Sequence, residues 1–154
     1  MGVVGVTLFT LIGWGMWRLS QPDYEFSNGR SLADNISGRW GWSTKSIPCA
    51  ADSGHTIAFS SDGKVMTITQ DELSVDDDGR DWTVTTYDVV STTASRVRGA
   101  IRGETRVTDD GRPVVWDLVV IDSNAYVWHR TDWPASGYTA RVIRCQARDV
   151  DLDA

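Results

Sequence analysis

The sequence predicts an all-β fold: an eight-stranded antiparallel up-and-down barrel preceded by one N-terminal transmembrane helix. Three observations support this prediction. Short runs of alternating or β-branched residues recur along the chain, each bounded by Gly, Asp, Asn, Ser or Pro. No segment with helical periodicity separates these runs, so neighbouring strands are expected to be antiparallel and to follow one another in order. An apolar stretch at the N terminus precedes them all.

The chain has 154 residues and a formal net charge of −6 at pH 7. That length fits one domain with a tether. The negative charge argues against a nucleic-acid partner, because phosphate binding requires a basic surface. Four parts are expected: a membrane anchor or uncleaved signal segment at 1–19, a linker at 20–37, a β-barrel domain at 38–146 and an acidic tail at 147–154.

The N-terminal segment, Gly2 to Leu19, carries no charge before Arg18. Its length approaches the hydrocarbon core of a bilayer, which is roughly 30 Å thick. Trp14 and Trp17 near its end are typical of a membrane interface. A basic region before the apolar run and a small-residue cleavage site after it are both missing. We therefore expect an uncleaved signal-anchor.

Two cysteines, Cys49 and Cys145, lie near the two ends of the strand region. Because they follow an apolar N-terminal segment, a disulfide formed in an oxidising compartment is the preferred interpretation, and two buried free thiols are the alternative. Arg18 alone would place the following chain in the cytoplasm, whereas the cysteines favour the opposite side. We therefore predict a single-pass protein of the inner (plasma) membrane with its C-terminal domain extracytoplasmic, in the periplasm.

The linker and the strands are defined by local turn and capping signals. Ser31 and Asp34 form a capping pattern that predicts a short helical turn ending at Ile36. The strongest hairpin signal is Asp62-Gly63, which lies between two alternating runs. The predicted strands cover residues 39–44, 55–60, 64–69, 81–90, 96–108, 113–121, 125–131 and 138–145. Closure into a barrel removes both exposed edges; an open sheet or a two-sheet sandwich is the alternative.

For two of the predicted strands, the sequence indicates which residues face solvent and which face the core. In 96–108 the charged residues, the last of which is Arg106, are expected to face solvent. The residues that alternate with them, the last of which is Val107, are expected to face the core. In 113–121 both faces are largely apolar, because Asp117 is the only charged residue. Such a strand needs cover on both sides, which the linker, a partner or a membrane surface would supply.

Two motifs carry a family resemblance. Gly38-Arg39-Trp40 opens the first strand directly after the predicted helical turn, and Asp62-Gly63-Lys64 forms a hairpin turn. Both resemble features of the lipocalin-like (calycin) barrels. The resemblance implies an eight-stranded barrel in which Trp40 packs at the closed end beneath an arginine of the last strand. Arg141 is the expected partner of Trp40, and Arg144 is the other candidate.

The sequence contains no recognisable catalytic or metal-binding constellation. Neither His55 nor His129 has a His or Cys at metal-ligand spacing, so both are expected at the surface. The acidic turn at 76–81 lacks the ligand spacing of a calcium loop. No Gly-x-Ser-x-Gly motif occurs either. We therefore expect no enzyme activity, no metal and no cofactor.

Large aromatic residues are frequent, with eight Trp and four Tyr in the chain. The simplest interpretation is a small barrel filled with large rings. The alternative is that some rings line an apolar pocket or form an exposed contact patch. The candidate residues for ligand or partner binding are Trp116, Tyr126, Trp128 and Trp133. Trp133 precedes Pro134 in a predicted loop, which makes it the best single candidate for a contact residue.

These features predict a non-enzymatic binding module, anchored in the membrane and exposed outside the cytoplasm, that serves as an accessory subunit of a membrane protein complex. The alternative is a carrier that holds a small apolar ligand inside the barrel. The expected partners are the membrane, through the N-terminal segment, and a protein of the same complex. A function as a protease inhibitor or as a hydrolase is less favoured than these two hypotheses, because no inhibitory segment and no hydrolase motif are identified.

Overall fold

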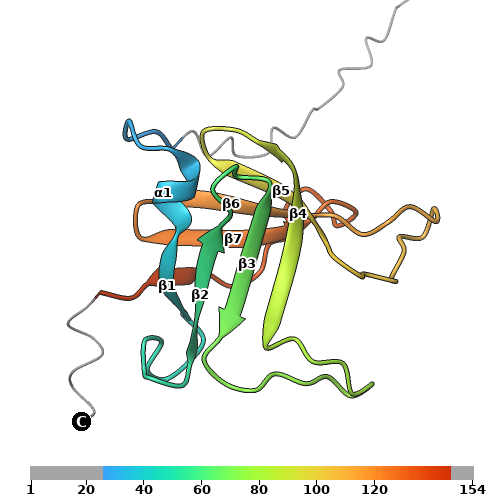
Figure 1. The fold of residues 1–154 in the computed structure, drawn as a ribbon, viewed down its shortest axis with the longest axis horizontal. Helices are drawn as coiled ribbons and strands as arrows, with labels where there is room; N and C mark the ends of the chain where they lie inside the picture. The colour runs from blue at the N-terminus through green and yellow to red at the C-terminus, as the bar shows by residue number, and fades with distance from the viewer. Residues whose placement is uncertain (1–25, 147–154) are drawn as a thin grey trace, which may run out of the picture.

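The computed structural model describes residues 26–146, so the predicted membrane anchor and acidic tail lie outside the described residues (Figure 1). Between residues 26 and 146 no helix is long and apolar enough to cross a membrane. The helix is α1 (Leu32–Ile36), and the strands are β1 (Gly38–Trp42), β2 (Gly54–Phe59), β3 (Val65–Gln70), β4 (Val84–Thr92), β5 (Arg96–Ile101), β6 (Trp116–Asp122), β7 (Ala125–Arg130) and β8 (Val142–Arg144).

These eight strands form one closed antiparallel barrel in which each strand pairs with its neighbours in sequence (Figure 1). The last strand closes the barrel, since Val142 and Arg144 of β8 pair with Trp42 and Trp40 of β1. Closure gives every strand a partner on both sides and leaves no open sheet edge. The predicted eight-stranded antiparallel barrel is therefore confirmed.

The helix α1 covers one end of the barrel, at the start of β1 (Figure 1). Its N-cap is Ser31, whose side chain accepts a hydrogen bond of 3.1 Å from the backbone N–H of Asp34. Ile36, at the end of the helix, is fully buried in the core. Its carbonyl oxygen accepts a 2.8 Å hydrogen bond from the indole N–H of Trp40. The predicted helical turn is thus present and closes this end of the barrel.

The arginine that covers Trp40 is Arg144 and not Arg141. Its guanidinium carbon lies 4.2 Å from the centroid of the Trp40 ring. Its side chain also donates hydrogen bonds to three backbone carbonyls, those of Asn35, Ser37 and Ser123. The prediction of Arg141 was wrong because β8 begins at Val142, so Arg141 lies exposed before the strand while Arg144 stands directly opposite Trp40 in register.

The predicted disulfide between Cys49 and Cys145 is present, with the two Cα atoms 5.5 Å apart. It joins the loop between β1 and β2 to the residue that follows β8. The same loop packs tightly against Gly41, where a Cβ atom would lie 1.7 Å from the carbonyl oxygen of Pro48. Only glycine permits this approach, so Gly41 and the disulfide together fix the loop against β1.

The fifth strand is shorter than predicted. β5 ends at Ile101, and Gly103 follows in a turn with φ +74°, a backbone conformation that favours glycine. Because the chain turns there, the alternation expected for 96–108 does not continue. Val107 is 60% exposed although it was expected to face the core, whereas Arg106 lines the mouth of the barrel cavity with its side chain half exposed.

The sixth strand is covered on both faces, as its composition requires. Its inner face contributes Leu118 and Val120 to the core, and both are fully buried. On the outer face Val119 is also buried, and Asp117 is held by two hydrogen bonds of 2.7 and 2.8 Å from Arg98. A buried carboxylate is tolerated when a guanidinium pairs with it in this bidentate manner. The outer face of β6 is therefore not an open apolar patch.

Candidate ligand-binding site

The barrel contains a cavity of about 400 Å³ at the end opposite α1. Its lining includes residues from the strands and from the connections β3–β4, β5–β6 and β7–β8, which lie at the same end because the strands alternate in direction. The volume lies within the range of about 300–1,000 Å³ that is common for small-molecule sites. The cavity is therefore large enough for a small ligand.

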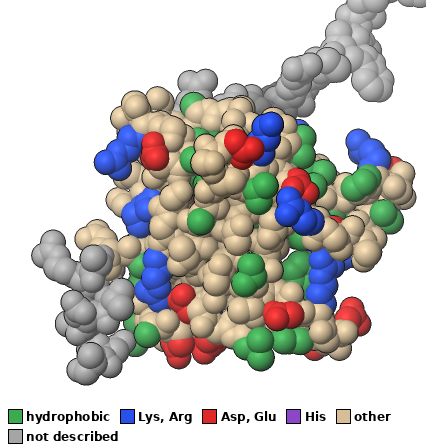
Figure 2. Space-filling model, viewed as in Figure 1, with side chains coloured by type: hydrophobic (Ala, Val, Ile, Leu, Met, Phe, Trp, Pro, Cys, Tyr) green, Lys and Arg blue, Asp and Glu red, His purple; other side chains and the backbone are tan. Residues whose placement is uncertain are grey.

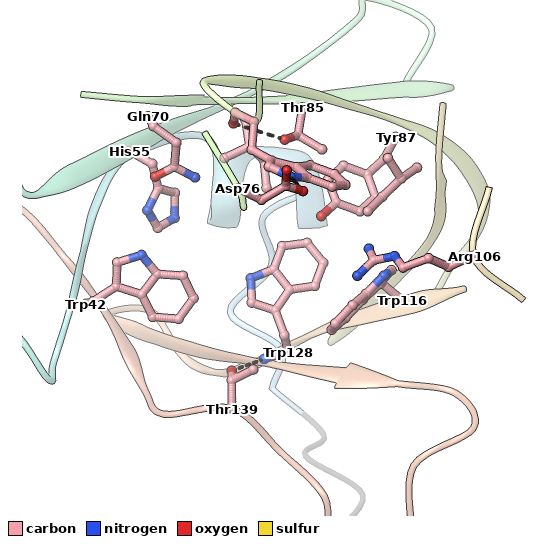
Figure 3. Close-up of a pocket in the computed structure, with 13 residues that line it drawn as sticks. Trp42, His55, Gln70, Asp76, Thr85, Tyr87, Arg106, Trp116, Trp128 and Thr139 are labelled. Atoms are coloured by element: carbon pink, nitrogen blue, oxygen red, sulfur yellow. Dashed lines mark hydrogen bonds between the residues drawn. The ribbon is translucent and has the colours of Figure 1, made fainter. Parts of the chain in front are cut away.

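Five Trp and Tyr side chains belong to the wall of the cavity (Figure 3). The rings of Tyr87 and Trp128 are stacked, with centroids 5.3 Å apart and an interplanar angle of 19°. Trp116 stands edge-on to Trp128, with centroids 6.3 Å apart. A Cβ atom on Gly99 would lie 3.2 Å from the Cβ atom of Tyr87, so this inward glycine makes room for the ring. The wall is completed by Trp42 and Trp82.

Most polar groups of the lining are already bonded to other protein atoms. The carboxylate of Asp76 accepts a 2.7 Å hydrogen bond from the indole N–H of Trp82 and further bonds from backbone N–H groups of its own turn. The hydroxyl of Thr139 accepts a 3.0 Å bond from the backbone N–H of Trp128. These bonds hold the wall together.

His55 is the most deeply buried polar residue of the lining. Its side chain is 1% exposed, and its Nε2 atom shares a hydrogen bond with the hydroxyl of Tyr126. Burial lowers the pKa of His55 to about 4, because the charged imidazolium would lose its hydration. Asp71 opposes this lowering of the pKa and Arg39 adds to it. The imidazole is therefore neutral at pH 7.

The prediction that both histidines lie at the surface was wrong. His55 shares the inner face of β2 with Ile57, so strand alternation turns it into the barrel. His129 is 5% exposed on the outer side of β7, where its Nδ1 atom lies 2.8 Å from the carbonyl oxygen of Gly137 and its ring packs on Tyr138. Both side chains are thus fixed by the fold rather than solvated.

Three buried side-chain polar atoms have no hydrogen-bond partner among residues 26–146: Nδ1 of His55, Nε1 of Trp116 and the hydroxyl oxygen of Tyr138. His55 and Trp116 line the cavity, whereas Tyr138 does not. A buried polar group without a partner costs about 1–3 kcal/mol. Two of these three groups belong to residues of the cavity lining, although the nitrogen atoms themselves are enclosed by protein.

Positive charge at the mouth of the cavity is held by ion pairs and ring contacts. Arg106 donates a 2.6 Å hydrogen bond to Glu104, and this bond lowers the pKa of Glu104 to about 2. The guanidinium carbon of Arg80 lies 3.9 Å from the centroid of the Trp82 ring. These contacts position Arg106 and Trp82 as fixed parts of the rim.

The four predicted binding residues form one connected series of ring contacts. Trp116 and Trp128 line the cavity. Tyr126 lies behind the wall, fully buried, with its ring centroid 6.1 Å from that of Trp128. Trp133 lies outside the lining and packs edge-on against Trp116, at 5.4 Å between centroids. The structure therefore brings all four together, two of them at the cavity surface.

Several lining residues were not identified as binding candidates from the sequence. The signal for His55 and Trp42 was the strand alternation itself, since each lies two residues from an inward side chain, Ile57 and Trp40 respectively. No comparable signal exists for Arg106, whose position depends on the turn after β5.

Among the described residues, the histidine and the carboxylate that line the cavity are not bonded to each other. His55 and Asp76 both line it, but His55 bonds to Tyr126 and Asp76 bonds to Trp82. From residue 26 to residue 146, no group of three or more His, Cys, Asp or Glu residues is placed to hold a metal ion.

Comparisons of the chain with known protein families, with curated proteins and with solved structures found no match.

Proposed function

We propose that this protein is a non-enzymatic, lipocalin-like binding protein that holds a small, largely apolar ligand inside its barrel. The observation that carries the proposal is the cavity of about 400 Å³, whose lining combines five Trp and Tyr rings with six polar or charged residues. Small-molecule sites are typically concave and mostly apolar, with a small number of polar groups that orient the ligand. The aromatic wall of this barrel fits that description.

The alternative, that the rings only fill the core, describes the other end of the barrel better. There Trp40 and Tyr126 are both fully buried and in contact, with ring centroids 4.8 Å apart. At the open end the rings of Trp42, Trp82 and Trp116 are only partly buried and surround space. Rings that were needed only as core would be expected to pack against one another and leave no cavity.

Binding of an apolar fluorescent probe to the full chain tests this proposal. N-phenylnaphthylamine should bind with increased emission, and Thr85→Phe should weaken its binding by about tenfold or more, because the new ring occupies the cavity. The matched control is Thr86→Phe, which places the same side chain on the outer face of β4 and should leave the affinity unchanged. Equal binding by Thr85→Phe and the unaltered chain would contradict the proposal.

A second function, as an accessory subunit of a membrane protein complex, is favoured by one surface feature. Apolar side chains are exposed on the loops of the open end, with Ile47 60%, Leu73 76% and Val75 51% exposed. On the face shown in Figure 2, hydrophobic side chains occur in small groups among charged ones. Such a surface would place a protein partner beside the cavity mouth.

Co-purification in mild detergent tests the accessory role. The full chain should retain a larger partner, and Leu73→Ser with Val75→Ser should release it, because these substitutions remove the exposed apolar contact. Val90→Ser is the control, since Val90 is 62% exposed but lies on the strand β4. Purification of the unaltered chain with no partner would exclude this function.

We also propose that the domain lies outside the cytoplasm, in the periplasm, behind an inner-membrane anchor. The Cys49–Cys145 disulfide and the apolar N-terminal segment support this location. A thiol count on the membrane-extracted protein, under denaturing and non-reducing conditions, should find no free thiol. Two free thiols would instead favour a domain at the cytoplasmic face.

A further inference from the structure

We infer that the ligand is a small organic cation, with a tertiary or quaternary ammonium group on an apolar body, and that the ammonium group lies among the aromatic rings of the cavity. The inference rests on the proposed ligand-binding function and adds the charge of the ligand to it. Its basis is the ring content of the cavity together with the distribution of charge around the mouth.

The aromatic rings of the lining surround one space. Figure 3 shows Trp42, Tyr87, Trp116 and Trp128 around it. The face of an aromatic ring carries partial negative charge and attracts a cation within about 6 Å of its centroid, most strongly for Trp and where water is excluded. Several rings around one space are the arrangement that recognises quaternary ammonium groups. A cavity of about 400 Å³ with four Trp rings and one Tyr ring therefore suits such a group.

One ring at the mouth already holds cations of the protein itself. The guanidinium carbons of Arg80 and Arg106 lie 3.9 and 5.4 Å from the centroid of the Trp82 ring. The other two contacts of this kind within residues 26–146 involve Trp40 and Trp133, which are not part of the lining. The remaining four rings of the cavity are therefore not occupied by an arginine or lysine.

The buried titratable groups of the lining are neutral and do not repel a cation. Burial lowers the pKa of His55 to about 4, so its imidazole carries no charge at pH 7. Burial also raises the pKa of Tyr87 well above its ordinary value, so its hydroxyl stays protonated. An ammonium group in the cavity would thus meet no positive charge in the buried part of the wall.

The two charged residues of the lining, Asp76 and Arg106, lie at the mouth. Arg106 donates to both carboxylate oxygens of Glu104, at 3.0 and 2.6 Å, and Arg80 lies 3.7 Å from the same carboxylate. Asp76 accepts the indole N–H of Trp82 and backbone N–H groups of its turn, and these bonds lower its pKa, so it stays negative. The two arginines and two carboxylates balance, so the sign of the potential is decided by the groups around them.

The charge around the mouth comes from the connection 71–83, between β3 and β4. It carries one guanidinium, Arg80, against six carboxylates, a net charge of −5: Asp71, Glu72, Asp76, Asp77, Asp78 and Asp81. The other connections at the open end, 43–53, 102–115 and 131–141, each contain equal numbers of acidic and basic residues. A negative potential at the mouth of a cleft raises the local concentration of cations and lowers that of anions. The rings and the loop charge therefore favour the same kind of ligand.

The test uses three probes that share a naphthalene ring and displace N-phenylnaphthylamine from the full chain: trimethyl(2-naphthyl)ammonium, 2-tert-butylnaphthalene and 2-naphthalenesulfonate. The first two have the same shape and differ in whether the central atom of the substituent is a charged nitrogen or a carbon. The ammonium probe should bind about tenfold more tightly than the tert-butyl probe, and the sulfonate about tenfold more weakly than the tert-butyl probe.

Two variants assign the effect to the rings and to the loop. Trp42→Leu keeps an apolar side chain but removes a ring face, so it should weaken the ammonium probe about fivefold more than the tert-butyl probe. Asp77→Asn with Asp78→Asn removes two exposed charges of the loop and should weaken the ammonium probe about threefold at low salt. The matched control is Asp34→Asn with Asp122→Asn, which removes two exposed charges at the closed end and should leave all three affinities unchanged.

The possible failures are distinguishable. Absence of displacement by every probe, together with no binding of N-phenylnaphthylamine, would contradict the ligand-binding function and, with it, the inference. Equal affinity for the ammonium and tert-butyl probes, or tightest binding of the sulfonate, would leave ligand binding intact and overturn the assignment of a cationic ligand. This comparison is made in the unaltered chain, so it decides the question even if Trp42→Leu does not fold.

Discussion

The closed and open ends of the barrel use tryptophan in different ways. At the closed end Trp40 is fully buried, its N–H donates to the carbonyl oxygen of Ile36, and Arg144 covers its ring. At the open end Trp116 is only partly buried, and its N–H has no partner among the described residues. Close packing and saturated hydrogen bonding stabilise the closed end, whereas partly buried rings around a cavity leave apolar surface for a ligand.

The largest expected effect of this difference is on stability at the closed end. Trp40→Ala removes a fully buried ring and its hydrogen bond, so it should lower the free energy of unfolding by about 3–5 kcal/mol. Trp42→Ala, two residues further along the same face, removes a partly buried ring and should cost about 1–2 kcal/mol. Urea denaturation measures both values. Similar costs would mean that the open end is as much a packed core as the closed end.

The disulfide connects the two regions, because it ties the loop after β1 to the residue after β8. Its two cysteines are 96 residues apart in sequence, so cross-linking restricts the unfolded chain considerably. Replacement of both by alanine should lower the free energy of unfolding by about 2–5 kcal/mol. Reduction of the unaltered protein, followed by denaturant titration, should give a similar loss. An unchanged midpoint would show that the packing around Gly41 alone fixes the loop.

The features that the sequence predicted correctly depend on local chemistry. Turn residues bound each strand, Ser31 caps the short helix, and Asp62-Gly63 makes the β2–β3 turn. Barrel closure then followed from eight consecutive antiparallel strands, since an open sheet would leave edges unpaired. Local signals were thus sufficient for the order and number of strands.

The features that were missed depend on register and on single turns. Whether Arg141 or Arg144 covers Trp40 is decided by where β8 begins, a difference of a few residues. Arg106 reaches the cavity because the chain turns at Gly103 instead of continuing as a strand. A shift of one residue reverses the direction of every following side chain. Site residues on loops are therefore harder to predict than the strands that support them.

Acidification should weaken the fold through His55, which lies between the two ends. Because burial lowers its pKa from 6.5 to about 4, the folded state resists protonation that the unfolded chain accepts. The free energy of unfolding should therefore be unaffected by His55 above pH 6.5, and fall by up to about 3 kcal/mol as the pH decreases from 6.5 to 4. His55→Gln should lack this part of the pH dependence in denaturant titrations at several pH values. An identical pH profile for the two proteins would contradict the burial of a neutral imidazole.

The smallest expected effect distinguishes the two arginines near the closed end. Arg144→Lys keeps the charge but loses the planar group that lies on Trp40 and donates to the carbonyl oxygens of Asn35, Ser37 and Ser123. Since one ammonium cannot reproduce these contacts, the free energy of unfolding should fall by about 1–2 kcal/mol. Arg141→Lys changes an exposed side chain and should stay within about 0.5 kcal/mol of the unaltered protein. Neither variant touches the cavity lining, so the affinity for N-phenylnaphthylamine should be the same in both. A loss of affinity in Arg144→Lys would show that the closed end, through the contact of Trp40 with Tyr126, also supports the open end.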